Sequence, residues 1–276
     1  MTERMLIAQI SDTHIKPEGR LAYRRVDTAA FLARAVDHLR RLVPRPDVVL
    51  ATGDLVDAGL REEYVHLRRL LAPLPMPVFL IPGNHDAREP MREVFADHAY
   101  LPRNGEFLHY VVEDYPVRLI GLDTLVPGEG GGRLGEARLQ WLDRRLGEAP
   151  QRPTLIFMHH PPFRTGIARM DAIGLADAEA FGAVIERHRQ VEAIVCGHLH
   201  RPIHTRWRGT VVTTAPSPAH QVALDVRESG ELGWVMEPPA VLLHLWRPGQ
   251  GLVTHTSYVG DYAGPYPFHE AGRLID

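Results

Sequence analysis

The chain has 276 residues, of which 45% are hydrophobic and 24% are charged, a composition typical of a globular protein with a large core. Its formal net charge of −3 argues against a broad polyanion-binding surface, and short basic clusters such as residues 39–45 are interpreted as solvated helix faces. A single cysteine, Cys196, excludes an intrachain disulfide, and the apolar run near the N-terminus is shorter than a signal peptide or a membrane span, so we expect a soluble, cytoplasmic protein.

Apolar runs and helical periodicity alternate along the chain. In chain order, strands are expected at residues 4–10, 47–52, 77–81, 107–114, 117–123, 154–158 and 191–197. Helices are expected at residues 27–43, 61–72, 89–97, 135–147 and 177–189, the first of them capped by Asp27 or Thr28. The strands on either side of Tyr115 and Pro116 are expected to form a hairpin. This alternation is typical of an α/β fold with mixed or parallel sheets.

Potential metal ligands follow five of the predicted strands, always at the carboxyl end. They are Asp12 and His14 in "SDTH", Asp54 in "GD", Asn84, His85 and Asp86 in "GNHD", His159 and His160 in "HHPP", and His198 and His200 in "GHLH". Open α/β sheets carry their functional sites at this edge. Scattered capping and core residues would not recur at five strand ends, so the pattern predicts one shared site.

The residue types at these strand ends predict the chemistry of the site. Carboxylates, an amide and imidazoles without a thiolate exclude a structural cysteine-rich zinc site, and they suit divalent Mn, Fe, Zn or Co. Six or seven ligands are too many for one catalytic ion that keeps an open position. They suit two ions that share a carboxylate, an arrangement typical of in-line displacement at phosphorus.

The five motifs resemble the pattern of the calcineurin-like metallophosphoesterase superfamily, which is D-x-H, G-D, G-N-H-[DE], H and G-H-x-H in that order. The resemblance implies an α/β fold that is a four-layer αββα sandwich. It also implies two divalent metal ions as cofactors. Around one ion it places Asp12, His14, Asp54 and His200, and around the other it places a bridging Asp54 with Asn84, His159 and His198.

Three consecutive residues have catalytic roles in this resemblance. Asn84 would give its amide oxygen to an ion and, with His85 and His198, would contact the substrate phosphate. His85 would protonate the leaving alkoxide, a role that contributes about 10²–10⁴-fold to the rate. Asp86 would orient His85, or would act as the N-cap of the next helix.

Two further residues near the motifs have open roles. His160 is expected to pack or to support the site, because the resemblance puts the ligand at the first histidine of the pair. Tyr23 lies where the resembling proteins have a tyrosine at the pocket mouth, so it is a candidate substrate-binding residue or a packing aromatic.

Longer stretches narrow the resemblance to one branch. "IFMHHPPFRTGIARMD", "APSPAHQV" and "DYAGPYPF" are similar to bacterial glycerophosphodiesterases and class III cyclic nucleotide phosphodiesterases, and more to the former. This implies a phosphodiesterase for small diesters, either glycerophosphodiesters or cyclic nucleotides, in which a metal-bridging hydroxide attacks phosphorus in line. The alternatives are a phosphomonoesterase, a nuclease, which the negative net charge does not favour, and a non-catalytic scaffold, against which the complete ligand set argues.

The proline-rich chain after residue 215 requires a separate interpretation. Residues 1–215 are expected to form the catalytic domain, and residues 216–276 a β-rich extension packed on it, with strands at 240–246 and 252–259. The resemblance implies that this extension forms a cap and a dimer contact near the site entrance, hence a homodimer or higher homo-oligomer. Among the late histidines, His220 is the one expected to approach the site.

Overall fold

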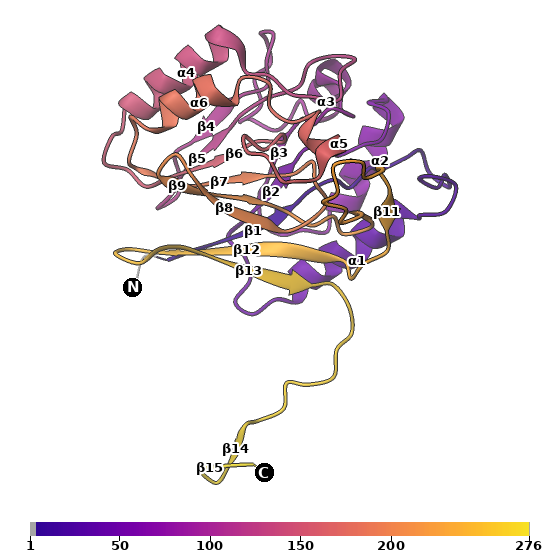
Figure 1. The fold of residues 1–276 in the computed structure, drawn as a ribbon. Helices are drawn as coiled ribbons and strands as arrows, with labels where there is room; N and C mark the ends of the chain where they lie inside the picture. Colours follow the sequence, from indigo (N-terminus) through magenta and orange to yellow (C-terminus); the bar gives the residue numbers. More distant parts are fainter. Residues whose placement is uncertain (1–3, 276) are drawn as a thin grey trace.

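The computed structural model describes residues 4–275, and within them two β-sheets face each other between helices (Figure 1). The first sheet has the strand order β13-β12-β1-β2-β3 and the second has the order β4-β5-β6-β7-β9-β8. This is the expected α/β sandwich. Its two apolar sheet faces pack against each other, and this packing positions the carboxyl ends of both sheets.

The first sheet combines strands from both ends of the chain. Its members are β1 (Met5–Ile10), β2 (Val48–Thr52), β3 (Val78–Ile81), β12 (Ala240–Arg247) and β13 (Gly251–Tyr258). The first three run parallel, and β12 pairs antiparallel with β1. All residues of β1 and β2 are buried, as expected for near-continuous apolar strands covered on both faces.

The second sheet comes from the middle of the chain. Its members are β4 (Tyr110–Val112), β5 (Arg118–Gly121), β6 (Thr154–Phe157), β7 (Val191–Cys196), β8 (Ile203–Trp207) and β9 (Thr210–Thr214). The predicted hairpin is confirmed, because β4 pairs antiparallel with β5. Strands β5, β6, β7 and β9 run parallel, so their carboxyl ends lie at one edge.

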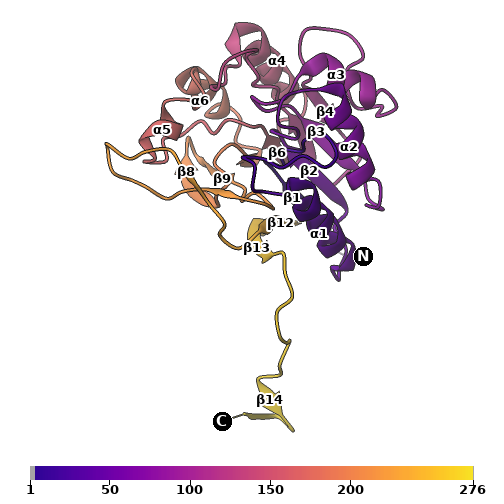
Figure 2. The same ribbon diagram turned by 90° about the vertical axis from the view of Figure 1, so that its right-hand side faces the viewer.

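The helices lie outside the two sheets. Toward the first sheet are α1 (Thr28–Arg41), α2 (Arg61–Leu71) and α3 (Arg88–Val94), and on the second sheet are α4 (Gly135–Gly147) and α6 (Ala178–Ile185) (Figures 1 and 2). A one-turn helix, α5 (Ala168–Asp171), was not predicted. Asp27 caps α1 as expected, since its carboxylate accepts a hydrogen bond from the amide of Ala30 at 3.0 Å. None of the helices within residues 4–275 combines the length and the apolar character needed to cross a bilayer.

The chain after residue 215 has three structurally different parts. Residues 216–238 run beside the ligand-bearing edge and contain the short strands β10 (Gln221–Val222) and β11 (Trp234–Val235). The predicted strands at 240–246 and 252–259 are present as β12 and β13, and they complete the first sheet. Residues 260–275 then leave the body and end in a small hairpin of β14 (His269–Glu270) and β15 (Arg273–Leu274) (Figures 1 and 2). The sheets therefore continue across the boundary that the sequence predicted at residue 215.

A polar contact joins the two sheets inside the apolar core. The side-chain amide of Gln9 donates to Oγ1 of Thr52 at 2.9 Å and to the carbonyl oxygen of Cys196 in the other sheet, also at 2.9 Å. Its amide oxygen lies 3.0 Å from Nε2 of His244 on β12. Because these groups are buried, each hydrogen bond offsets a desolvation cost and holds the sheets in register.

Candidate metal centre

The predicted ligands converge at the shared carboxyl edge of the two sheets. They follow β1, β2 and β3 of the first sheet and β6 and β7 of the second. Five of them have positive backbone φ angles, which non-glycine residues seldom adopt: Asp12 (55°), His14 (42°), Asp54 (46°), His198 (71°) and His200 (51°). Such strained backbones persist where the surrounding structure fixes them, and they concentrate at functional sites.

One group of donor atoms surrounds the amide oxygen of Asn84. This oxygen lies 3.1 Å from Nε2 of His159 and 3.1 Å from Nδ1 of His198, and the two nitrogens are 3.3 Å apart. Oδ2 of Asp54 lies 3.4 Å from Nε2 of His159. Ligands of one ion lie roughly 3.0–3.6 Å apart when metal–ligand bonds are about 2.0–2.2 Å long. The four atoms therefore fit a single divalent ion.

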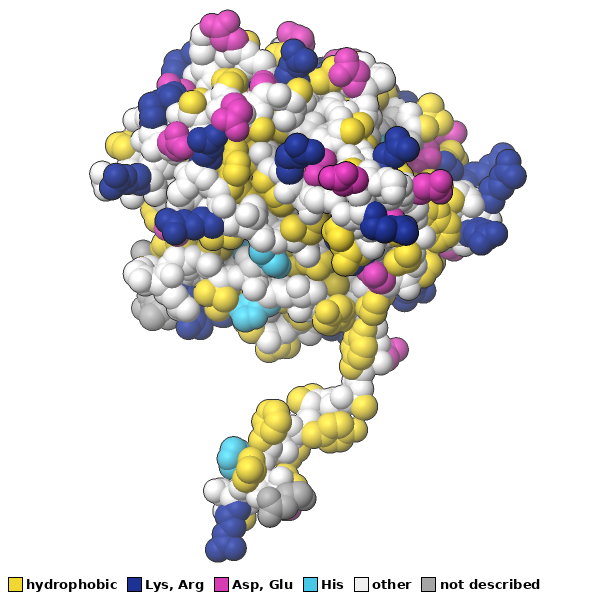
Figure 3. Space-filling view, in the orientation of Figure 1, with side chains coloured by type: hydrophobic (Ala, Val, Ile, Leu, Met, Phe, Trp, Pro, Cys, Tyr) yellow, Lys and Arg dark blue, Asp and Glu magenta, His cyan; other side chains and the backbone are white. Residues whose placement is uncertain are grey.

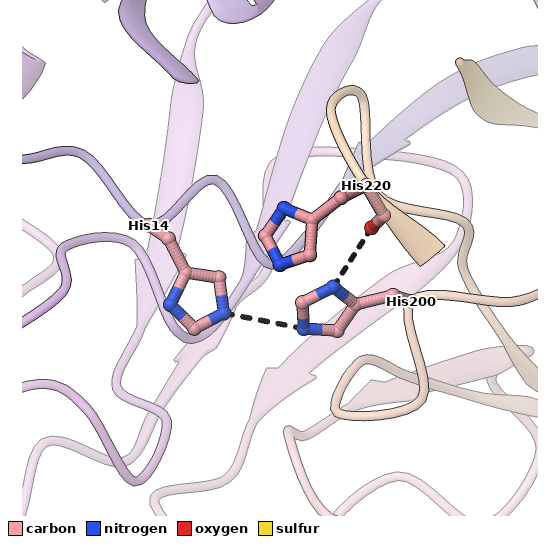
Figure 4. A group of neighbouring side chains, drawn as sticks. All are labelled: His14, His200 and His220. Carbon is pink, nitrogen blue, oxygen red and sulfur yellow. Dashed lines mark hydrogen bonds between the residues drawn. The ribbon is translucent and has the colours of Figure 1, made fainter. Parts of the chain in front are cut away.

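A second group of donor atoms lies on the other side of Asp54. Nε2 of His14 faces Nε2 of His200 (Figure 4), and the two nitrogens are 3.2 Å apart. Nε2 of His14 also lies 3.7 Å from Oδ2 of Asp54. Oδ1 of Asp12 is 3.5 Å from Nε2 of His200. These distances also suit one ion. The same oxygen of Asp54 belongs to both groups, which is the arrangement expected of a bridging carboxylate.

Hydrogen bonds on the outer side of two imidazoles select the tautomer that a ligand needs. Nδ1 of His159 donates to the carbonyl oxygen of Thr52 at 2.8 Å, and Nδ1 of His200 donates to the carbonyl oxygen of His220 at 2.9 Å (Figure 4). Each bond places the proton on Nδ1, so the lone pair of Nε2 is directed to the centre. Outer hydrogen bonds of this kind accompany most metal-bound histidines.

The buried charges are arranged around Asp54. Burial by itself would raise the pKa of Asp54, but the neighbouring His159, His14 and His85 hold it well below its usual range. Burial would lower the pKa of His159, yet Asp54 and Asp12 raise it to about 9. Asp54 and His159 therefore stabilise each other's charged forms. Divalent cations would displace the proton of His159, because metal binding to such ligands releases protons.

Glycine is required where the ligand loops approach one another. A Cβ atom built on Gly83 overlaps the backbone nitrogen and a carboxylate oxygen of Asp54, and it lies 2.9 Å from Cε1 of His159. A Cβ atom on Gly53 lies 2.5 Å from Nδ1 of His159 and 2.7 Å from the nitrogen of Gly83. The glycines of the "GD" and "GNHD" motifs thus let two loops close over one imidazole.

The structure corrects the role expected for Asp86. Its carboxylate accepts from the amides of Gly83 (2.8 Å), Leu55 (3.1 Å) and Val56 (3.3 Å) and from the hydroxyl of Tyr64 (2.8 Å). It does not orient His85, and it is not the helix cap either, because Ala87 occupies the N-cap of α3. Asp86 instead joins the two loops that carry Asp54 and Asn84, since its carboxylate accepts from amides of both loops and also from Tyr64 of α2.

The ring of His85 is held by a residue that the motif analysis did not select. Nδ1 of His85 donates to the main-chain carbonyl of Asp57 at 2.8 Å, and the backbone amide of His85 donates to Oδ1 of Asp54 at 2.9 Å. The other ring nitrogen is then free to face the cavity that His85 lines. Asp57 lies three residues after Asp54, and this spacing within "GDLVD" is the one sequence signal that could have identified it.

His160 is buried beside the donor groups, but its ring nitrogens have partners elsewhere in the protein. Its Nδ1 lies 2.8 Å from Oγ1 of Thr124, and its Nε2 lies 3.1 Å from the carbonyl oxygen of Gly130. Both nitrogens are therefore used in hydrogen bonds within the protein. The ring packs against His198, with the centroids 4.6 Å apart.

A cavity of about 300 Å³ opens over the donor groups. Its floor includes Asp54, Asn84 and His198, and its wall is formed by apolar and aromatic side chains: Tyr23, Met170, Ile173, Val222, Leu232 and Trp234. Tyr23 stacks on Trp234, with ring centroids 5.5 Å apart, and it meets the edge of His220 at 5.1 Å. His220 itself lies 4.7 Å from the ring of His200, which confirms that it approaches the site (Figure 4).

Comparison with known proteins identifies the family of the chain. Residues 5–202 match the family described as calcineurin-like phosphoesterase. The chain belongs to the calcineurin-like phosphoesterase family. The matched range includes every predicted metal ligand, from Asp12 to His200. Members of this family depend on a dinuclear metal centre, and the described part of the chain brings together histidines and aspartates that could hold metal ions.

Individual relatives place the chain within a bacterial branch of the calcineurin-like phosphoesterases. It is 44% identical over 274 residues to the probable glycerophosphodiester phosphodiesterase GpdQ of Arcobacter nitrofigilis, covering 99% of this chain and 100% of that protein. It is 33% identical over 220 residues to the 3′,5′-cyclic adenosine monophosphate phosphodiesterase CpdA of Pseudomonas aeruginosa, covering 79% and 78% of the two chains. A dimetal phosphatase from Danio rerio shares the fold, with a TM-score of 0.63, 18% identity and coverage of 94% and 100%.

Proposed function

We propose that this protein hydrolyses small phosphodiesters at a centre of two divalent ions. The observation that carries the proposal is the position of Oδ2 of Asp54, 3.4 Å from Nε2 of His159 in one donor group and 3.7 Å from Nε2 of His14 in the other. A carboxylate shared in this way suits two adjacent ions, and pairs of ions are the common means of displacing an oxygen at phosphorus. The names of the relatives GpdQ and CpdA support a diester substrate.

Each proposed ion has four protein ligands, and the two ions share Asp54. Asp12, His14, Asp54 and His200 would hold the first, and Asp54, Asn84, His159 and His198 would hold the second. When bound, the ions supply Lewis-acid stabilisation of phosphate oxygens and an activated water. Their nitrogen and oxygen ligands suit Mn, Fe, Zn or Co.

Two further residues have roles in this proposal that depend on their own geometry. His85 faces the cavity and has one nitrogen fixed by the Asp57 carbonyl, so its other nitrogen can carry a proton toward the leaving oxygen. His220 lies beside His14 and His200 and lines the same cavity, so it would contact the substrate next to the first ion.

The cavity wall supports a small substrate with an apolar or aromatic group. Among the described residues that line the cavity there is no lysine or arginine, although a nucleic-acid backbone would require such cations along its path. The stacked pair of Tyr23 and Trp234 can instead receive a flat group, since aromatic faces bind bases by stacking. These features favour a compact diester, either a glycerophosphodiester or a cyclic nucleotide, over a nuclease substrate.

A panel of substrates tests the proposal. Protein reconstituted with Mn²⁺ would be assayed for kcat/KM on 3′,5′-cyclic AMP, 2′,3′-cyclic AMP, a glycerophosphodiester, an aryl diester and an aryl monoester. The proposal expects a clear preference for diesters, and the best of them identifies the substrate class. A preference for the monoester would replace it with a phosphomonoesterase, and purified protein that binds no metal would favour the non-catalytic scaffold.

We further propose a homodimer or higher homo-oligomer in which residues 216–276 act as the extension of the catalytic unit 1–215. Support comes from the terminal segment, where Tyr262, Tyr266 and Phe268 are 64%, 75% and 81% exposed. Figure 3 shows apolar side chains along this segment, away from the body. An isolated hairpin as short as β14–β15 is not stable in water, so a second copy of the chain is the partner proposed to cover it. The single buried Cys196 suits the proposed cytoplasmic location.

A further inference from the structure

Asp57 lies directly behind the metal centre without lining the substrate cavity. It follows the strained turn after β2, and its backbone amide donates to the carbonyl oxygen of Ile15 at 3.1 Å. Its side chain is 19% exposed. This position joins the loop that carries Asp54 to the loop that carries His14, and it brings two different groups of Asp57 against two different site histidines.

The carboxylate of Asp57 faces the outer nitrogen of His14. Its Oδ1 lies 3.4 Å from Nδ1 of His14, a charge contact rather than a formed hydrogen bond, and within the described structure this buried nitrogen has no hydrogen-bond partner. Nε2, on the other side of the ring, faces His200 and Asp54 in the first donor group. A carboxylate behind an imidazole keeps the proton on Nδ1 and makes Nε2 a better metal ligand. His159 and His200 have carbonyl oxygens in this place, so His14 is the ligand backed by a charge.

The main-chain carbonyl of Asp57 performs the corresponding task for His85. It accepts the Nδ1 proton of His85 at 2.8 Å. The rings of His14 and His85 then meet edge to face, with their centroids 4.6 Å apart. One residue therefore orients a metal ligand with its side chain and the proposed proton donor with its backbone.

Lys16 completes the arrangement. Its ammonium group forms a close ion pair with Oδ2 of Asp57, and its main-chain carbonyl accepts a hydrogen bond from Nδ1 of His66 at 2.9 Å. The ion pair uses one carboxylate oxygen and leaves Oδ1 directed at His14. It also balances the charge that Asp57 brings beside a buried site.

We propose that Asp57 is a positioning residue, which sets the tautomer and orientation of His14 through its carboxylate and of His85 through its carbonyl. Because only the first ion has His14 as a ligand, the carboxylate affects the two ions unequally. This inference rests on the proposed metal centre, and it adds a prediction that the centre alone does not make: removal of the charge of Asp57 weakens one ion selectively.

The test is a competition between the full-length protein and a chromophoric chelator for Zn²⁺, performed on the wild type and on Asp57→Asn. Asparagine keeps the shape and removes the charge. We expect two ions in the wild type, and in the variant a 10–100-fold weaker affinity for one of them, the usual effect of losing such a partner. The affinity for the other ion and the melting temperature of the metal-free protein should not change. Asp37→Asn removes a half-exposed carboxylate on α1 and is the matched control.

Three results would overturn the inference. The first is unchanged affinity for both ions in Asp57→Asn. The second is equal loss of both ions or a lower melting temperature of the metal-free variant, since either would mean a structural role only. The third is a third ion that Asp57→Asn abolishes, because Asp57 would then be a ligand itself.

A second variant keeps the test decisive if Asp57→Asn does not fold. Lys16→Met leaves the Asp57 carboxylate beside His14 and removes the ammonium group that competes with His14 for this carboxylate. The first ion should therefore bind at least as tightly as in the wild type. Weaker binding would contradict the inference. A wild-type protein that binds no metal would reject the proposed function instead, so the two failures are distinguishable.

Discussion

The amide oxygen of Asn84 lies 3.1 Å from Nε2 of His159, although 75 residues separate them in the chain. Asn84 follows β3 of the first sheet and His159 follows β6 of the second, so the contact exists only because the sheets face each other. The same oxygen is 3.1 Å from Nδ1 of His198. The side-chain amide of Asn84, from the first sheet, thus contacts two histidines that follow strands of the second sheet.

Replacement of Asn84 by alanine should remove one of the two ions. The variant loses the oxygen that His159 and His198 surround, so the second ion has three protein ligands left. We expect one bound ion instead of two in metal analysis. The activity should fall by about 10²–10³-fold, the cost of losing one preorganised electrostatic group. Asn84→Asp restores an oxygen in the same place and is the control that should again bind two ions.

Replacement of His85 by alanine should slow the reaction without loss of metal. His85 is not in either donor group, and its ring is held by the Asp57 carbonyl at 2.8 Å. If it protonates the leaving oxygen, kcat should fall by about 10²–10⁴-fold for an alkyl diester. An aryl diester should be affected much less, because its leaving group needs no proton. Equal losses on both substrates would contradict the role as a proton donor.

Replacement of Asp86 by asparagine should destabilise the protein although the two side chains have the same shape. The carboxylate accepts from three backbone amides and from the hydroxyl of Tyr64, whereas an asparagine would turn its own donors toward some of them. We expect a loss of roughly 1–3 kcal/mol of unfolding free energy in urea titrations. Asp37→Asn, at a half-exposed position, should change it little. A stability equal to that of the wild type would mean that these hydrogen bonds are not formed.

Stability should fall in mild acid because of His244. Burial lowers the pKa of His244 from 6.5 to about 3 in the folded protein. Between these two values the unfolded chain binds a proton that the folded chain does not, so stability decreases as the pH falls below 6.5. The slope is at most about 1.4 kcal/mol per pH unit, or about 2 kcal/mol at pH 5.

The contribution of His244 can be isolated by substitution. His244→Gln removes the titrating group between Gln9 and Thr254, so its unfolding free energy should change less than that of the wild type from pH 7 to pH 5. His255→Gln, at an exposed position on the neighbouring strand β13, is the control and should follow the wild type. Parallel pH profiles for the wild type and His244→Gln would reject the assignment.

Removal of residues 260–276 should convert the proposed oligomer into a monomer. The exposed aromatic residues Tyr262, Tyr266 and Phe268 would be lost, while β12 and β13 would remain in the first sheet. Light scattering at micromolar concentration should give a multiple of 31.0 kDa for the full chain and about one copy for the truncated chain. A full chain that is already monomeric would defeat the proposal of an oligomer.

Motifs and apolar periodicity were sufficient to predict the candidate ligand set and the class of fold. Metal ligands are limited to a few residue types, and parallel strands bring their carboxyl ends to one edge, so Asp12, Asp54 and His198 could be assigned to one site from motifs alone. Apolar periodicity likewise predicted the helix at 135–147 and the hairpin of β4 and β5. These features are local, and they depend on neighbours a few residues apart.

The surroundings of the predicted ligands could be identified only from the folded chain. Asp86 was expected beside His85, but its carboxylate is used by Tyr64 and by backbone amides from a loop about thirty residues away, as the 31-residue separation from Leu55 shows. The contacts of Asp57 and the insertion of β12 next to β1 depend on distant segments in the same way. No local pattern encodes such contacts, because buried donors and acceptors take whatever partners the packed sheets bring within reach.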